Sequence, residues 1–190
     1  MEVGLFFGSF NPIHTGHMII ASLVKETTSV KEVWFIVSPQ NPFKKNKQLL
    51  HEFDRLDLVQ SAINDDFGFR VSDIEFNMPR PSYTVDTLTL IQEKNKDKKF
   101  RLIIGGDNIE SFQKWKNYDQ ILEHHGLIVY PRPSMKKNEI LDHHNVQMIE
   151  APEMDISATQ IRKLLKQGKS IKYLVPRSVE ERIGAKGFYT

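Results

Sequence analysis

Cysteine is absent from the 190 residues, so disulfides, thiolate metal sites and a cysteine nucleophile are all excluded. Long hydrophobic runs are absent too, because no segment approaches the roughly 18–20 apolar residues of a membrane span. A secretory signal is not expected, since Glu2 stands where such a signal is positive and the first apolar run ends at Phe7. These absences predict a cytoplasmic protein with no membrane partner.

Charge of one sign is not in excess either. Lys and Arg number 26 and Asp and Glu number 24, which gives a formal net charge of +2. This near balance gives no support for a nucleic-acid coat or a membrane-surface protein, so we expect no nucleic-acid partner. The length suits a single domain over residues 1–190.

Six short apolar runs recur along the chain at fairly even intervals. They are mostly continuous rather than alternating, which indicates strands buried on both faces, as in a parallel sheet. Stretches with helical spacing lie between them, and this alternation predicts right-handed βαβ units in a doubly wound, mostly parallel α/β fold of three layers. The apolar runs are 3–7, 33–37, 69–71, 101–104, 127–130 and 146–149, and the helical stretches are 17–28, the one through Phe53, Leu56, Val59 and Ile63, and the one through Val85, Leu88 and Ile91.

The end of the chain is expected to be helical. Residues 155–168 have the pattern of a helix opened by Ser157 in a capping box and closed by Gly168. A second short helix is expected after Pro176. We expect this helical portion, about residues 156–184, to pack on the sheet within the same domain.

The segment GSFNPIHTGH, residues 8–17, directly follows the first predicted strand. Ligands of open α/β sheets bind beyond the carboxyl ends of the strands. Gly8 and Gly16 let the backbone turn and approach a ligand closely, and free N–H groups at the start of the next helix favour an anion. We therefore expect His14 and His17 to flank an anion, either as neutral donors or as protonated counter-charges. A metal site fits less well, because no third ligand is evident.

This segment resembles the (H/T)xGH signature of the nucleotidyltransferase superfamily, which shares its core with class I aminoacyl-tRNA synthetases. ISATQIR (156–162) resembles the second signature of that superfamily, ISxTxIR. The resemblance implies that the two segments hold the phosphates of ATP. It implies an ATP site made by Gly8, Ser9, Phe10, His14, His17, Gly105, Asp107, Ile156, Ser157 and Arg162.

Two further segments, SYTVDTL (82–88) and GGDNIESFQKWKNYDQIL (105–122), resemble the bacterial nicotinate-nucleotide adenylyltransferase family. The resemblance implies that Tyr83 and Thr84 lie near the carboxylate of a pyridine ring and that Trp115 stacks on the ring. An indole between two lysines also suits a flat, anionic aromatic ligand. The implied reaction transfers AMP from ATP to nicotinate mononucleotide and gives deamido-NAD and pyrophosphate.

SPQNPFKK (38–45) departs from that family, which usually has two prolines, a histidine and a basic residue after its second strand. Read without a gap, Lys44 replaces the histidine and Lys45 is the basic residue; shifted by one, Lys44 is the basic residue. Gln40 then stands where the family has a substrate-contacting asparagine. The resemblance implies catalytic roles for His14, His17, Lys44 and Arg162, and substrate contacts from Gln40, Lys45, Tyr83, Thr84 and Trp115.

Mg²⁺ is the implied cofactor, and it is expected to arrive with ATP because no acidic cluster is visible in the sequence. The adjacent pairs His124–His125 and His143–His144 are expected to be exposed, with side chains that point apart. Alternatives stay open: the same chemistry on nicotinamide mononucleotide or phosphopantetheine, or a non-catalytic nucleotide- or RNA-binding module. The oligomeric state, including a homo-oligomer, is open as well.

Overall fold

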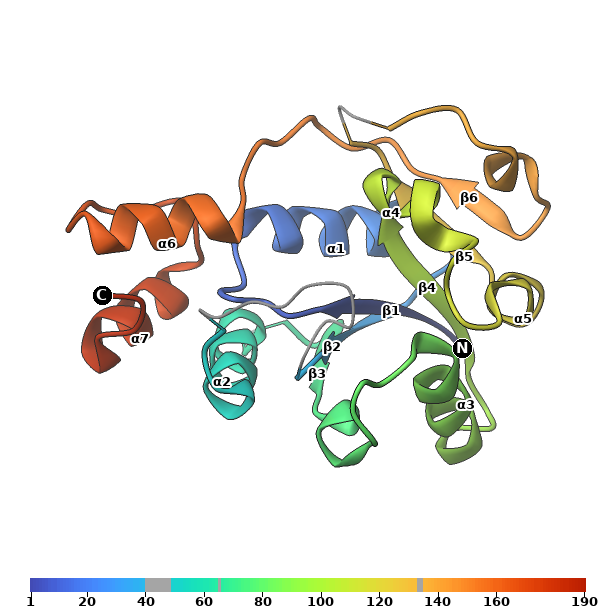
Figure 1. Ribbon diagram of the computed structural model, residues 1–190, viewed down its shortest axis with the longest axis horizontal. Helices are drawn as coiled ribbons and strands as arrows, with labels where there is room; N and C mark the ends of the chain where they lie inside the picture. Colours follow the sequence, from blue (N-terminus) through green and yellow to red (C-terminus); the bar gives the residue numbers. More distant parts are fainter. Residues whose placement is uncertain (40–48, 65, 133–134) are drawn as a thin grey trace.

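The computed structural model describes residues 1–39, 49–64, 66–132 and 135–190. Its centre is a six-stranded sheet of strand order β3-β2-β1-β4-β5-β6, in which each of these neighbouring pairs is parallel (Figure 1). The predicted parallel sheet is therefore confirmed, and each predicted apolar run coincides with a strand. The strands are β1 (Glu2–Gly8), β2 (Glu32–Val37), β3 (Phe69–Ser72), β4 (Lys99–Gly105), β5 (Leu127–Tyr130) and β6 (Val146–Met148).

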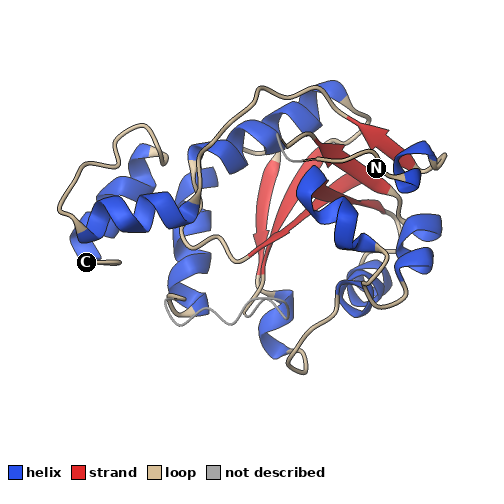
Figure 2. Ribbon diagram, turned by 45° about the horizontal axis from the view of Figure 1, so that its top comes forward, coloured by secondary structure: helices blue, strands red, loops and turns tan. Residues whose placement is uncertain are grey.

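Helices cover both faces of the sheet (Figure 2). Two hydrophobic clusters separate the layers: buried residues of α1, α2, α6 and α7 belong to one, and those of α3, α4 and α5 to the other. Continuous apolar strands follow from this arrangement, since β1, β2, β4 and β5 each supply side chains to both clusters. The helices are α1 (Thr15–Thr27), α2 (Glu52–Ile63), α3 (Thr84–Lys94), α4 (Gly106–Phe112), α5 (Tyr118–His124), α6 (Ala158–Lys166) and α7 (Arg177–Lys186), with short 3₁₀ turns η1 (Ile74–Asn77) and η2 (Glu139–Asp142).

Helix α2 differs from its predicted apolar stripe at two positions. Phe53 was expected to be buried but is 58% exposed, and its ring lies at the edge of the helix, 5.2 Å from that of Phe76. Arg55, two residues on, is fully buried. The periodicity is wrong here because a guanidinium, not a phenyl ring, fills the space between the first turn of α2 and the sheet.

The last two helices extend the layer that contains α2. Ser157 caps α6 as predicted, and Gly168 follows that helix with a φ of +65°. α7 packs along α2, and both α6 and α7 lie beyond the end of the sheet in Figure 1. Ile161 and Val179 are fully buried in the same cluster as the inner residues of α2. Across the residues that the structure describes, none of the helices combines the length and apolarity needed to cross a membrane.

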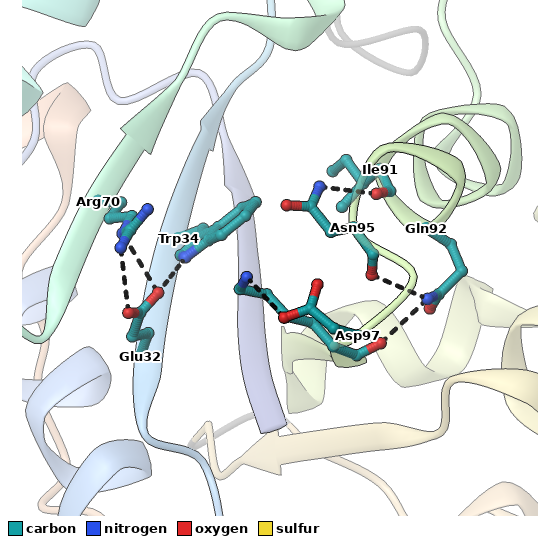
Figure 3. A network of polar contacts seen from close by, with 8 residues as sticks. Glu32, Trp34, Arg70, Ile91, Gln92, Asn95 and Asp97 are labelled. Carbon is teal, nitrogen blue, oxygen red and sulfur yellow. Dashed lines mark hydrogen bonds and ion pairs between the residues drawn. The ribbon is translucent and has the colours of Figure 1, made fainter. Parts of the chain in front are cut away.

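A polar network fixes the amino-terminal end of the sheet (Figure 3). The indole Nε1 of Trp34 donates to Glu32 at 2.9 Å, and Arg70 pairs with the same carboxylate at 3.2 Å. On the neighbouring turn, the amide of Gln92 donates to the carbonyls of Asn95 and of residue 98. Trp34 is thus held by the scaffold, at the end of the strands opposite to that from which the predicted ligand loops leave.

Candidate active site

The carboxyl ends of β1 and β4 mark the place where the connections of the chain diverge. β1 lies between β2 and β4 in the sheet. The loop after β1 leads to α1 on one face, and the loop after β4 leads to α4 on the other. This divergence opens the crevice in which open α/β sheets bind their ligands.

His14 and His17 lie at the start of α1 with stacked rings, whose centroids are 3.7 Å apart and whose planes differ by 25°. The backbone N–H of His14 donates to Nδ1 of His17 at 3.2 Å. Nδ1 of His17 is therefore an acceptor, so the proton of the neutral ring is on Nε2. This leaves Nε2 of His17 able to donate a hydrogen bond.

Both imidazoles are neutral at pH 7. Burial first, and the Arg132 guanidinium second, lower the pKa of His14 from 6.5 to about 4. Burial also lowers the pKa of His17 well below 6.5, with further contributions from His14 and Arg132. Of the two alternatives that the sequence left open, the structure favours neutral donors over protonated counter-charges.

Two glycines of the histidine loop (residues 8–17) give room to side chains within the loop. A Cβ at Gly8 would lie 2.8 Å from the ring of Phe10, which is buried. A Cβ at Gly16 would lie 3.1 Å from Nδ1 of His14. The expected reason for these glycines, a close approach of a ligand to the backbone, is thus joined by a second one: each leaves space for an aromatic ring.

Ile156, Ser157 and Arg162 approach this loop from the other end of the chain. The hydroxyl of Ser157 accepts a hydrogen bond from the backbone N–H of Gln160 at 3.2 Å. Arg162 donates from Nη1 to the carbonyl oxygen of Asn11 at 2.7 Å, while its buried Nε has no hydrogen-bond partner among the described residues. The structure therefore brings the two predicted phosphate-binding segments together.

Arg132 is a candidate that the sequence analysis missed. It follows β5 and lines a hollow together with His14, Gly16, His17 and Ile156. Its guanidinium lies 5.3 Å from the centroid of the Tyr130 ring, and its buried Nε has no partner within the described part of the chain. The signal was available, because PRP directly follows a buried strand, just as the histidine loop does.

Gly105 on β4 and Asp107 on α4 lie beside Tyr130, behind the residues that line the hollow. A Cβ at Gly105 would collide with the carboxylate of Asp107 and lie 3.0 Å from the ring of Tyr130. Tyr130 itself lines the hollow. These predicted nucleotide contacts thus lie at the carboxyl end of β4, across the crevice from the histidine loop.

The residues expected at the pyridine ring lie together around the first turn of α3. Tyr83, 41% exposed, is the N-cap of that helix and Thr84 is its first residue. Lys116 pairs with the Asp86 carboxylate at 2.9 Å, and its Nζ lies 4.9 Å from the centroid of the Tyr83 ring. Trp115 is half-buried, so part of the indole stays accessible. Lys116 therefore links the tryptophan segment to the tyrosine.

Glu75 supports the start of α3, where Tyr83 and Thr84 lie, and sequence analysis did not find it. Its side chain is buried and accepts hydrogen bonds from the hydroxyls of Thr87, at 2.8 Å, and of Ser38 and Ser82. Burial raises the pKa of this carboxyl group despite those donors. Ser82 directly precedes Tyr83, so Glu75 ties the tyrosine to the end of β2. In the sequence, a glutamate in a polar stretch has no feature that predicts burial.

Arg55 joins the loops after β1 and β2. Its Nη1 donates to the carbonyl oxygens of Ser9 at 2.6 Å and Ser38 at 2.8 Å, and its Nη2 to that of Pro39 at 3.0 Å. Its Nε donates to the carbonyl of Leu50 at 2.8 Å. The guanidinium therefore sets the spacing between two loops that carry predicted site residues.

Three of the predicted site residues, Gln40, Lys44 and Lys45, lie outside the described residues.

Within the described ranges, the one group of three or more metal-ligating side chains is Glu123, His143 and His144. The rings of His143 and His144 are 4.3 Å apart, so the expectation that adjacent histidines point apart is wrong for this pair. These residues precede β5 and β6, at the amino ends of the strands and away from the crevice. They do not fit a metal that acts on phosphates bound at the histidine loop.

The chain is similar to known proteins over its whole length. The model of the cytidylyltransferase-like family matches residues 5–164. A relative from Cytophaga hutchinsonii, named "Probable nicotinate-nucleotide adenylyltransferase", is 57% identical over 100% of this chain and 99% of its own length. One of the same name from Flavobacterium psychrophilum is 44% identical with the same coverage.

Solved structures agree on the fold. Nicotinic acid mononucleotide adenylyltransferase from Plasmodium falciparum, complexed with NaAD, superposes with a TM-score of 0.83 at 20% identity and covers 99% of this chain and 97% of that one. A second structure of the same enzyme, complexed with APC, gives a TM-score of 0.82 at 20% identity over 99% and 96% of the two chains.

Proposed function

Because the chain belongs to the nicotinate-nucleotide adenylyltransferase family, we propose that it transfers AMP from ATP to nicotinate mononucleotide, giving deamido-NAD and pyrophosphate in NAD biosynthesis. The observation that carries this proposal is the identity of 57% over the whole chain to a relative of that name. The neutral histidine pair at the diverging strands β1 and β4 supports it, because such a pair offers hydrogen-bond donors to phosphate.

The chemistry is an in-line displacement at the α-phosphorus of ATP. A 5′-phosphate oxygen of the mononucleotide forms the new P–O bond, and the bond from that phosphorus to the bridging oxygen of pyrophosphate breaks. The attacking oxygen is an anion near pH 7, so no general base is needed. Catalysis then depends on positioning and on stabilisation of the charge that develops on the phosphates.

We assign the donors for that charge from both ends of the chain. Nε2–H of His17 and the ring of His14 contact the phosphates around the transferring centre. Arg162 stabilises the leaving pyrophosphate, and Lys44 or Lys45 adds a cation from the loop after β2. Neutral imidazoles suit this role, because they donate hydrogen bonds without a cost for burying charge in the free protein.

We assign the contacts to ATP to residues around the hollow. The backbone of Gly8, Ser9 and Phe10 faces the nucleotide on one side, Gly105 and Asp107 border its ribose and base on the other, and Ile156 and Ser157 complete the site. We add Arg132, whose guanidinium lines the hollow beside the histidine pair. Tyr83, Thr84, Trp115 and Gln40 are assigned to nicotinate mononucleotide.

Mg²⁺ is proposed to enter with ATP. The described residues of the crevice contain no group of three metal-ligating side chains, which fits an ion held by phosphate oxygens and water. When bound, the ion would neutralise charge on the leaving pyrophosphate, and protein groups would contact the phosphates directly.

The proposal is tested by pyrophosphate release from ATP with three acceptors in parallel: nicotinate mononucleotide, nicotinamide mononucleotide and phosphopantetheine. We expect the highest kcat/KM with nicotinate mononucleotide. Preference for the amide would change the acceptor, and release with none of the three would remove the assignment. Because the substrates are multiply charged phosphate esters, we expect the reaction in the cytoplasm. The near balance of acidic and basic residues leads us to expect no nucleic-acid partner.

A further inference from the structure

The histidine loop is held from outside by the helical portion at the end of the chain. Arg162 donates to the carbonyl oxygen of Asn11 at 2.7 Å. The carbonyls of the 173–174 turn accept the backbone N–H of Thr15 at 2.9 Å and its hydroxyl at 3.0 Å. The hydroxyl of Tyr189 donates to Oδ1 of Asn11 at 3.0 Å. Contacts from three separate segments thus converge on two residues of the histidine loop, Asn11 and Thr15.

Asn11 is the centre of these contacts. It is 2% exposed and lies three residues before His14. Its Oδ1 accepts the Tyr189 hydroxyl and also the backbone N–H of Leu50 at 3.2 Å. Any shift of Asn11 moves the entrance of α1, and with it the stacked imidazoles.

The backbone beside Asn11 depends on such support. Phe10 has a φ of +43°, in the left-handed region that a residue with a side chain adopts only when its surroundings enforce it. The bonds to Asn11 from Tyr189 and Arg162 act on the very next residue. The loop conformation is therefore maintained by contacts made far along the chain rather than by its own preference.

The Tyr189 bond is not required to attach α7. That helix is already held on α2 by the Arg182–Asp57 pair at 2.7 Å and by the bond from the Ser178 hydroxyl to the carbonyl of Ser61 at 2.7 Å. Val179 and Ile183 add buried apolar contact. Burial raises the pKa of the Tyr189 hydroxyl, so it stays a donor throughout the neutral range. Its bond is directed at the histidine loop alone.

We propose that Tyr189 is a positioning residue for adenylyl transfer: by holding Oδ1 of Asn11, it sets where His14 and His17 stand against the transferring phosphate. The inference rests on the proposed function for its kinetic effect. Small displacements of positioned groups are costly in phosphoryl chemistry, up to about 10²-fold in rate for roughly 1 Å.

Tyr189→Phe tests the proposal, because it removes the hydroxyl and keeps the ring. Ser178→Ala is the matched control, since it removes one hydroxyl bond of the same helical portion that points to α2. We expect Tyr189→Phe to lower kcat about tenfold with KM for nicotinate mononucleotide within twofold of wild type. Ser178→Ala should keep both constants. An equal kcat in the two variants would overturn the proposal.

A double-mutant cycle with Asn11→Ala separates positioning from general loss of stability. If Tyr189 acts through Asn11, the double variant should have the kcat of Asn11→Ala alone. Multiplicative losses would mean that the hydroxyl acts elsewhere.

The histidine ring resonances give a readout that needs no turnover. In spectra of protein labelled at histidine, Tyr189→Phe should shift the His14 and His17 signals, and Ser178→Ala should leave them in place. If the His14 and His17 signals do not shift in Tyr189→Phe, the proposal is overturned, whatever the activity of that variant. A wild-type protein that releases no pyrophosphate would reject the proposed function, and these spectra would still decide whether Tyr189 sets the imidazoles.

Discussion

The ring proton of His17 is placed by the protein's own backbone. Nδ1 accepts the N–H of His14, so Nε2 is the ring nitrogen left to donate to a ligand. Since both rings are neutral, the pair supplies hydrogen bonds rather than charge. The cations that we assign to the site are then arginines and lysines, residue types that are charged at pH 7.

His17→Ala removes that donor. We expect kcat to fall by about 10²-fold or more, the usual scale for losing a preorganised donor to a transition state. The measurement is the steady-state rate of pyrophosphate release, with circular dichroism to show that the fold persists. Turnover close to that of the wild type would refute the assignment of His17.

The lowered pKa of His14 makes a prediction about stability and pH. Its pKa is about 4 in the folded protein and 6.5 in the unfolded chain, so the unfolded chain binds more protons between these values. The free energy of unfolding should therefore decrease as the pH falls from 6.5 towards 4, by about 3 kcal/mol from this group at pH 4. Urea titrations should show a shallower decrease for His14→Gln than for wild type. Parallel curves for His14→Gln and wild type would contradict the reasoning.

Trp115→Ala tests the assignment of the pyridine contact. Loss of a stacking surface should raise KM for nicotinate mononucleotide about tenfold, corresponding to about 1.4 kcal/mol, with KM for ATP little changed. Trp34→Phe is the control, because Trp34 is held at the opposite end of the sheet by Glu32. Equal increases of the two KM values would make Trp115 a structural residue.

At the scale of elements, one guanidinium fixes the distance between two loops. Arg55 lies on α2 and donates to backbone carbonyls of the loops after β1 and β2 and to that of Leu50, with no carboxylate among these acceptors. Burial lowers its pKa to about 10, which still leaves it charged at pH 7. The loops after β1 and β2 thus share a single support.

Arg55→Ala should be strongly destabilising, since it leaves several buried carbonyl oxygens without donors. We expect a loss of at least about 3 kcal/mol in the free energy of unfolding, measured by urea titration. Arg70→Ala is the comparison, because its side chain is 58% exposed and its pair with Glu32 contributes at most about 1 kcal/mol. Similar losses for the two variants would show that the buried guanidinium is dispensable.

The strands and most of the helices could be predicted because their apolar residues follow the period of the element. Arg55 and Glu75 could not, because their burial depends on carbonyl and hydroxyl groups from other segments, which no local pattern displays. The two segments that we assign to phosphate binding could be recognised as motifs. That Arg162 reaches Asn11, 151 positions earlier, follows only once the strand order is known.

At the scale of the whole molecule, the organisation of residues 1–190 as one domain stays a prediction. The two hydrophobic clusters share strands β1, β2, β4 and β5, so neither can unfold without exposing the other. We expect a single transition, with coincident urea curves from circular dichroism and tryptophan fluorescence. Separate midpoints would divide the chain into two folding units.

The bond between Tyr189 and Asn11 spans 178 positions of the chain. A ribosome adds the tyrosine that braces the histidine loop 178 positions after it has added Asn11. A nascent chain can therefore complete its sheet while the reactive loop is still unbraced. Adenylyl transfer at full rate should begin only after residue 189 has cleared the exit tunnel.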